Sequence, residues 1–128
     1  MKALSNISRF IAASGLTNLG DGIATVAWAW VASLLTRDPL LIATVAVALR
    51  LPWAIFSLPA GIVTDRADRR LLILRMDVLR ALAFALAAVA LWLALPLDVA
   101  PARGLADPVA YAALLLAAAT VGVAEVFR

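Results

Sequence analysis

Two opposite charges, Asp21 and Arg50, lie deep inside long apolar stretches of the chain. Asp21 follows Arg9 by twelve residues, and Arg50 precedes Asp65 by fifteen. At about 1.5 Å per helical residue, both lie roughly 18–22 Å from the same membrane face, near the middle of a ~30 Å hydrocarbon core. A lipid-facing charge there costs about 2.5–3.5 kcal/mol on insertion scales, so we expect both side chains to point inward and to pair with each other. Such residues mark substrate or ion pathways by default, and the alternative is a static salt bridge that sets the helix register.

Small and polar side chains accompany both charges along one face of each predicted helix. Each stripe is spaced four, three and four residues apart: Ser14, Asn18, Asp21 and Thr25 in the first, and Arg50, Ala54, Ser57 and Gly61 in the second. Residues at this spacing share a helix face, so the stripes predict two helices that face a bundle interior or an aqueous cavity. Pro52 and Pro59 remove helix hydrogen bonds and predict kinks in the second helix.

Two further charges, Arg80 and Glu125, lie inside the later apolar stretches. Arg80 comes about ten residues into the third stretch, where it either snorkels to the cytoplasm or pairs with Asp77 at the i, i+3 spacing. Both alternatives remain open at this point. Glu125 lies roughly 26 Å from the outer end of the fourth stretch, so we expect it near the cytoplasmic face and in water.

Four apolar stretches carry these residues. Of the 128 residues, 66% are hydrophobic and 15% are charged, whereas soluble domains are about 45–50% apolar and about 25% charged. The stretches cover residues 10–36, 40–64, 71–97 and 108–127, and each is long enough to cross a bilayer as a helix. Period-two alternation is missing, so no strand is expected. The sequence predicts an all-α membrane protein with four transmembrane helices in one partial bundle over residues 1–128.

The composition excludes several function classes. The chain has no cysteine and no histidine, so we expect no metal site, no cofactor and no soluble metalloenzyme. No nucleophile–base pair is present either, and we expect no enzymatic activity. The net charge of +3 does not indicate a nucleic-acid partner, because the charges separate apolar stretches instead of forming one basic stripe.

The basic residues between the stretches predict the orientation. Six lie on one side of the membrane and two on the other: Lys2, Arg9, Arg66, Arg69, Arg70 and Arg75 against Arg37 and Arg103. Cytoplasmic loops carry the excess of Lys and Arg. The amino terminus and the connection between the second and third helices are therefore expected in the cytoplasm.

The connection between the second and third stretches is the most specific segment. Its sequence from Gly61 to Arg70 is GIVTDRADRR. It resembles the signature between helices two and three of the major facilitator superfamily, G-x-x-x-D-R-x-G-R-R/K, with Asp68 at the usual second glycine. Residues 18–22 and 51–61 resemble the bacterial exporter branch of that superfamily, which includes enterobactin- and macrolide-exporter-like proteins.

The resemblance implies a role for this segment as a cytoplasmic latch, formed by Gly61, Asp65, Arg66, Arg69 and Arg70. Gly61 would admit a neighbouring helix, and the Asp65 carboxylate would face the amino-terminal end of a helix from the other half of the transporter. Arg69 would bridge to an acid on the fourth helix, for which Glu125 is the candidate. The alternative is a basic loop that only sets topology.

Membership of this superfamily would make the chain the amino-terminal third of a twelve-helix transporter, within its six-helix amino-terminal bundle, in need of the remainder. The resemblance implies proton-driven efflux of a small amphipathic molecule, drug- or siderophore-like, across the cytoplasmic (inner) membrane of a bacterium. Asn18, Asp21, Arg50 and Arg80 would line the path, and Asp21 is the deep acid available for proton coupling. The alternatives are a four-helix small multidrug exporter acting as a dimer, and a non-transporting membrane remnant.

Overall fold

The computed structural model describes residues 2–96 and 100–127, which form four helices and no strand. The helices are α1 (Lys2–Leu35), α2 (Pro39–Arg66), α3 (Arg69–Ala94) and α4 (Pro108–Val126). The expectation of an all-helical protein is confirmed for these residues. Three of the helices, α2, α3 and α4, are long and apolar enough to cross a membrane. α1 is not among them, although four membrane-spanning helices were expected; its run contains the polar residues Asn18, Asp21 and Thr25.

Three of the helices begin on an aspartate that caps the helix. The Asp38 carboxylate accepts a hydrogen bond from the backbone N–H of Leu40 at 3.0 Å. Pro39, in the first turn, has no backbone N–H that would need an acceptor. Asp68 and Asp107 cap α3 and α4 in the same way. A cap of this kind stabilises a helix by about 1 kcal/mol.

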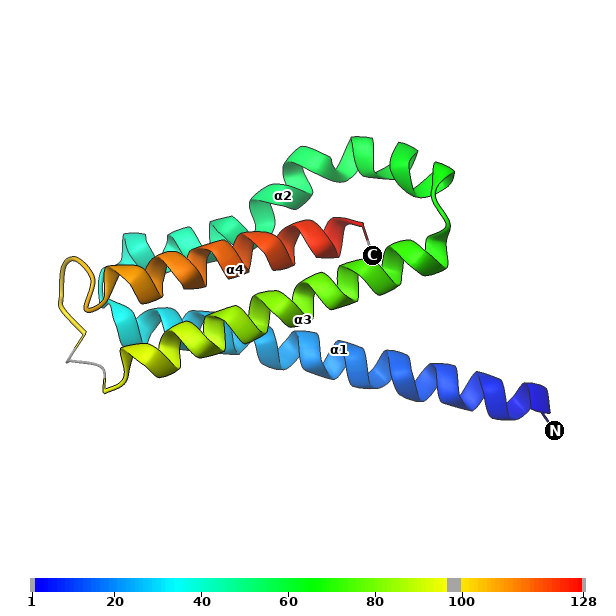
Figure 1. Ribbon diagram of the computed structural model, residues 1–128, viewed down its shortest axis with the longest axis horizontal. Coiled ribbons are helices and arrows are strands. Elements are labelled where there is room, and N and C mark those ends of the chain that lie inside the picture. The colour runs from blue at the N-terminus through cyan, green and yellow to red at the C-terminus, as the bar shows by residue number, and fades with distance from the viewer. Residues whose placement is uncertain (1, 97–99, 128) are drawn as a thin grey trace.

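α4 is the central helix of the bundle. Eight of its 19 residues are buried, against three of the 28 residues of α2. Figure 1 shows α2 and α3 on either side of it, with successive helices antiparallel. Most of its buried residues are alanine, valine or glycine, and small residues let neighbouring helices approach closely.

The bundle is held together at one end and open at the other. At the closed end, the chain after α1 bonds to the α3–α4 connection: Thr36 Oγ1 donates to the Gly104 carbonyl at 2.6 Å, and Ala106 N–H donates to the Leu35 carbonyl at 2.8 Å. At the other end, the amino-terminal part of α1 and the carboxy-terminal part of α2 lie away from α4 (Figure 1). The four helices therefore form a wedge that widens from the closed end.

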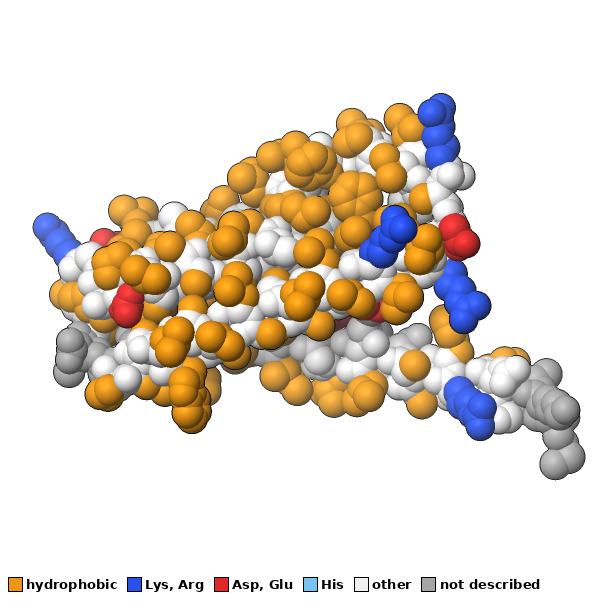
Figure 2. Space-filling model, in the orientation of Figure 1, with side chains coloured by type: hydrophobic (Ala, Val, Ile, Leu, Met, Phe, Trp, Pro, Cys, Tyr) orange, Lys and Arg blue, Asp and Glu red, His pale blue; other side chains and the backbone are white. Residues whose placement is uncertain are grey.

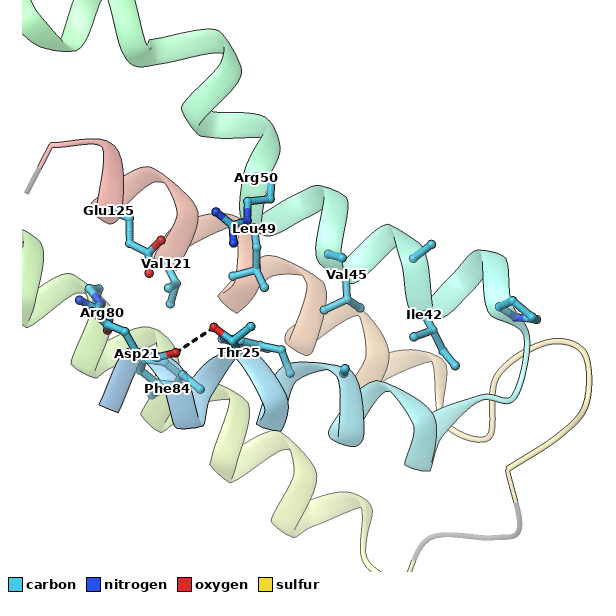
Figure 3. Close-up of a pocket in the computed structure, with 16 residues that line it drawn as sticks. Asp21, Thr25, Ile42, Val45, Leu49, Arg50, Arg80, Phe84, Val121 and Glu125 are labelled. Carbon is cyan, nitrogen blue, oxygen red and sulfur yellow. Dashed lines mark hydrogen bonds and ion pairs between the residues drawn. The ribbon is translucent and has the colours of Figure 1, made fainter. Parts of the chain in front are cut away.

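α2 bends in its middle, where Gly122 of α4 lies against it. Figure 3 places Arg50 at the bend, two residues before Pro52, which lies inside the helix and gives it no hydrogen bond from its nitrogen. A Cβ on Gly122 would collide with the Leu49 carbonyl oxygen and lie 3.1 Å from Cγ of Pro52. The close contact between α2 and α4 therefore depends on a glycine at position 122.

The surface is largely apolar, as a lipid environment requires. Figure 2 shows hydrophobic side chains over most of the visible face, with Lys and Arg side chains gathered mainly at the end where α2 gives way to α3. Exposed apolar side chains occur on all four helices, including Phe10, Leu58, Trp92 and Val109, each at least 73% exposed. Soluble monomeric proteins rarely expose so large a continuous apolar surface.

Candidate functional site

The four helices enclose a cavity of about 480 Å³. Every helix contributes to its wall, and the residues that Figure 3 labels are Asp21, Thr25, Ile42, Val45, Leu49, Arg50, Arg80, Phe84, Val121 and Glu125. Four of them are ionisable, two acids and two arginines, and the others are mostly apolar. The cavity therefore combines a small number of charges with an apolar wall, as ligand sites usually do.

An ion pair between α1 and α3 crosses the cavity wall. The Arg80 guanidinium donates a hydrogen bond from Nη2 to Oδ1 of Asp21. The side chains are 12% exposed for Arg80 and 34% exposed for Asp21, so the arginine does not extend into solvent.

This pairing corrects the one predicted for Asp21, whose expected partner was Arg50. Asp21 lies fourteen residues before the end of α1, and Arg80 lies fourteen residues before the end of α3. Both helices end at the closed end of the bundle, so the two residues lie at the same level, roughly 21 Å from it. Arg80, for which snorkelling and pairing with Asp77 were the alternatives considered, forms an ion pair with α1.

Aromatic stacking makes a second link between α1 and α3, closer to the closed end. The ring centroids of Trp28 and Phe84 are 5.4 Å apart, with an angle of 29° between the planes. Trp28 is buried, and both rings line the cavity. The stack therefore supplies the cavity with an aromatic wall next to the ion pair.

Arg50 and Glu125 also line the cavity. Neither forms an ion pair with any residue that the structure describes, and both residues are exposed. Arg50 extends from the bend of α2, and Glu125 from the last turn of α4 (Figure 3). Glu125 was expected in water near the cytoplasmic face; in the structure it is exposed and also lines the cavity.

Asn18 is not part of this cavity. It lines a shallow apolar groove on α1 together with Gly22, Val26 and Trp30. Asp21 and Thr25 of the same stripe do line the cavity, and Thr25 Oγ1 donates to the backbone carbonyl of Asp21 at 2.9 Å. The stripe is thus divided between two surfaces of α1.

The predicted latch residues lie at the open end of the bundle. Asp65 and Arg66 belong to the last turn of α2, and Arg69 and Arg70 to the first turn of α3. Only Ala67 and Asp68 connect the two helices, and all these side chains are exposed.

Asp68, at the position where the superfamily signature has a glycine, caps α3. The Asp68 carboxylate accepts hydrogen bonds from the N–H groups of Arg70 at 3.0 Å and Leu71 at 3.4 Å.

Gly61 and Arg69 do not meet the partners that the resemblance implies for them in the part of the chain that the structure describes. No atom of another element lies within 4 Å of the place that a Cβ would take on Gly61, and no ion pair joins Arg69 to Glu125.

The comparison with protein families identifies the chain. Residues 5–79 match the family model described as transmembrane secretion effector, a family of the major facilitator superfamily. The chain belongs to this family. The predicted resemblance to the superfamily is confirmed, and the match includes Asp21, Arg50 and the segment from Gly61 to Arg70. No curated protein and no solved structure gave a significant match.

As a member of the transmembrane secretion effector family, the protein is of the transporter type, with a small-molecule substrate and a lipid environment. The family match ends at residue 79, so it does not include Arg80, Phe84 and Glu125. The sequence had singled out Arg80 and Glu125, whereas Phe84 enters the site through the structure alone. Among the described residues, no group of three or more His, Cys, Asp or Glu side chains could hold a metal ion. The cavity offers a ligand two carboxylates, two guanidinium groups and an apolar wall.

Proposed function

We propose that the protein is a secondary active transporter that exports a small amphipathic molecule in exchange for protons, by alternating access. The observation that carries this proposal is the Asp21–Arg80 ion pair in the wall of a cavity to which all four helices contribute. Transporters of this kind bind substrate near the middle of the membrane, between bundles that rock against each other.

The ion pair provides a physical route from proton uptake to movement. When Asp21 takes up a proton, Arg80 keeps its charge but loses its partner inside an apolar wall. Asp21 is 34% exposed, so solvent screens the pair, and losing the partner costs less than the about 3–5 kcal/mol of a fully buried pair. The loss of the partner still favours a different arrangement of α1 and α3. Asp21 is therefore the coupling residue in this proposal, and Arg80 is the residue that transmits the change.

The basic end of the bundle supports the proposed orientation. The arginines at positions 66, 69, 70 and 75 lie at the end where α2 meets α3, and cytoplasmic segments carry such an excess. We propose that this end and the amino terminus face the cytoplasm, in the inner membrane of a bacterium.

The segment formed by Gly61, Asp65, Arg66, Arg69 and Arg70 then serves as a cytoplasmic latch between the halves of the transporter. Glu125 is the proposed partner of Arg69 in the state in which the open end has closed.

Transport by inverted membrane vesicles tests the coupling role of Asp21. The protein is produced from its own gene, the vesicle interior is acidified, and uptake of a fluorescent amphipathic dye is followed. Asp21→Asn is expected to abolish the proton-dependent part of the uptake. Asp107→Asn is the matched control, because asparagine also caps a helix and Asp107 lies in the α3–α4 connection. Undiminished proton-dependent uptake by Asp21→Asn would exclude Asp21 from the coupling mechanism.

The latch is tested separately with Arg69→Ala. We expect altered dye uptake from Arg69→Ala and unchanged uptake from Arg103→Ala, which removes an exposed arginine in the α3–α4 connection. Equal uptake by both variants and the wild type would leave the basic segment with a topological role alone.

A further inference from the structure

The charges that face the cavity are balanced but only half of them are paired. Asp21 and Arg80 neutralise each other across the wall. Arg50 and Glu125 face the same cavity without an ion-pair partner among the residues that the structure describes. A ligand with one negative charge would be attracted by Arg50 and repelled by Glu125, and a cation would experience the reverse. A ligand that carries both charges satisfies both residues.

The two unpaired charges lie on opposite sides of the ion pair along the bundle axis. Arg50 is eleven residues from the start of α2, and Glu125 is seventeen residues from the start of α4. Both helices start at the closed end, so the two Cα atoms differ by roughly 9 Å in level. A dipeptide backbone spans roughly 7 Å between its termini, and the two side chains can extend toward a ligand of that length.

The rest of the wall is suited to an apolar body between the two charged groups. The stacked rings of Trp28 and Phe84 lie on one side, and Leu49 and Val121 on another. The volume of about 480 Å³ lies within the ~300–1,000 Å³ typical of small-molecule sites. Aromatic side chains offer a ligand large contact area in addition to edge or face stacking.

We propose that this cavity binds a small zwitterionic amphipath, with its carboxylate on Arg50, its ammonium on Glu125 and its apolar part against Trp28 and Phe84. The inference rests on the proposed transport function and names the class of substrate for it. Charge-assisted hydrogen bonds at each end would orient the ligand across the cavity.

A matched set of four ligands tests the proposal: phenylalanyl-phenylalanine, its N-acetyl form, its C-terminal amide and the doubly capped form. They share one apolar body. In the order given, they carry both charges, a negative charge only, a positive charge only and no charge. Binding to the purified protein in nanodiscs is measured by calorimetry. We expect the zwitterion to bind roughly tenfold to a hundredfold more tightly than either singly charged form, as expected for the loss of a hydrogen bond to a charged group.

Two variants assign the ends of the ligand. Arg50→Gln should weaken the binding of the zwitterion and of the N-acetyl form by a similar factor and leave the affinity for the amide unchanged. Glu125→Gln should weaken the binding of the zwitterion and of the amide and leave the affinity for the N-acetyl form unchanged. Arg103→Gln, in the α3–α4 connection, is the control and should leave all four affinities as they are. Circular dichroism checks that each variant retains its helical content.

The proposal is overturned if the four ligands bind within twofold of one another, if none binds, or if both variants keep the wild-type order of affinities. Vesicle transport separates this failure from that of the proposed function. Proton-driven export of an uncharged dye without dipeptide binding overturns the ligand class alone. Dipeptide binding with the expected variant pattern, but without any proton-driven transport, supports the ligand class and overturns the transport mechanism.

Discussion

Gly122 of α4 lies directly against the backbone of Leu49 in α2, at the point where α2 bends. A side chain at position 122 would push α4 and α2 apart. The cavity residues Arg50 and Val121 are the immediate neighbours of this contact in sequence. The close approach therefore sets the distance between two walls of the cavity as well as the packing of α4.

Gly122→Ala is expected to lower the free energy of unfolding by about 1–3 kcal/mol, because the added methyl group cannot be accommodated without moving the backbone of α2. Thermal unfolding in detergent measures the change. Gly20→Ala is the control, since nothing lies within 4 Å of a Cβ at Gly20 and alanine favours a helix over glycine by up to about 1 kcal/mol. Equal unfolding temperatures for the two variants would contradict the close contact.

The partner of Asp21 can be established by two double-mutant cycles. Asp21→Asn combined with Arg80→Gln should show a coupling free energy of about 0.5–3 kcal/mol, as residues in direct contact do. Asp21→Asn combined with Arg50→Gln should be additive within about 0.5 kcal/mol if Arg80 is the partner. Thermal unfolding of the single and double variants gives the coupling free energies. A larger coupling in the Arg50 cycle than in the Arg80 cycle would reverse the assignment.

The stack between Trp28 and Phe84 should contribute measurably to stability. Phe84→Leu keeps an apolar side chain but removes the ring, and we expect a loss of about 0.5–1.5 kcal/mol. Phe10→Leu makes the same change at a position that is 73% exposed and should have little effect. A loss that is no larger at position 84 than at position 10 would show that the stack adds nothing to ordinary apolar contact.

The aspartate cap of α3 gives a prediction about the short connection to α2. Asp68→Ala should cost about 1 kcal/mol of unfolding free energy, because the amide groups of Arg70 and Leu71 lose their acceptor. Asp68→Asn retains a capping oxygen and should be nearly neutral. If both substitutions are equally destabilising, the negative charge of Asp68 is required for more than capping.

The sequence by itself determined the fold class, the four helices and the family. Apolar stretches of sufficient length predict membrane helices because the bilayer has a fixed thickness, and the GIVTDRADRR segment is specific enough to indicate the superfamily that the family comparison confirmed. It also predicted that Asn18, Asp21, Arg50 and Arg80 line one path, since charges inside apolar helices must point toward protein or water. The three charged residues line the cavity, whereas Asn18 lies in a separate groove. The aspartates before the apolar stretches, two of them followed by proline, were an unused signal for the helix starts.

Only the tertiary structure decided which charges meet. Depth alone did not select the partner of Asp21, because both Arg50 and Arg80 lie within roughly 5 Å of its level when residues are counted from the basic end. In the structure, Thr36 and Ala106 hold the connections together at the closed end, and Asp21 pairs with Arg80. Helical periodicity assigns residues to a face but does not say which helix that face meets. In the packed bundle, Asp21 of α1 meets Arg80 of α3, and Trp28 of α1 meets Phe84 of α3. These contacts join residues far apart in the chain, and their lateral arrangement is a property of the packed bundle.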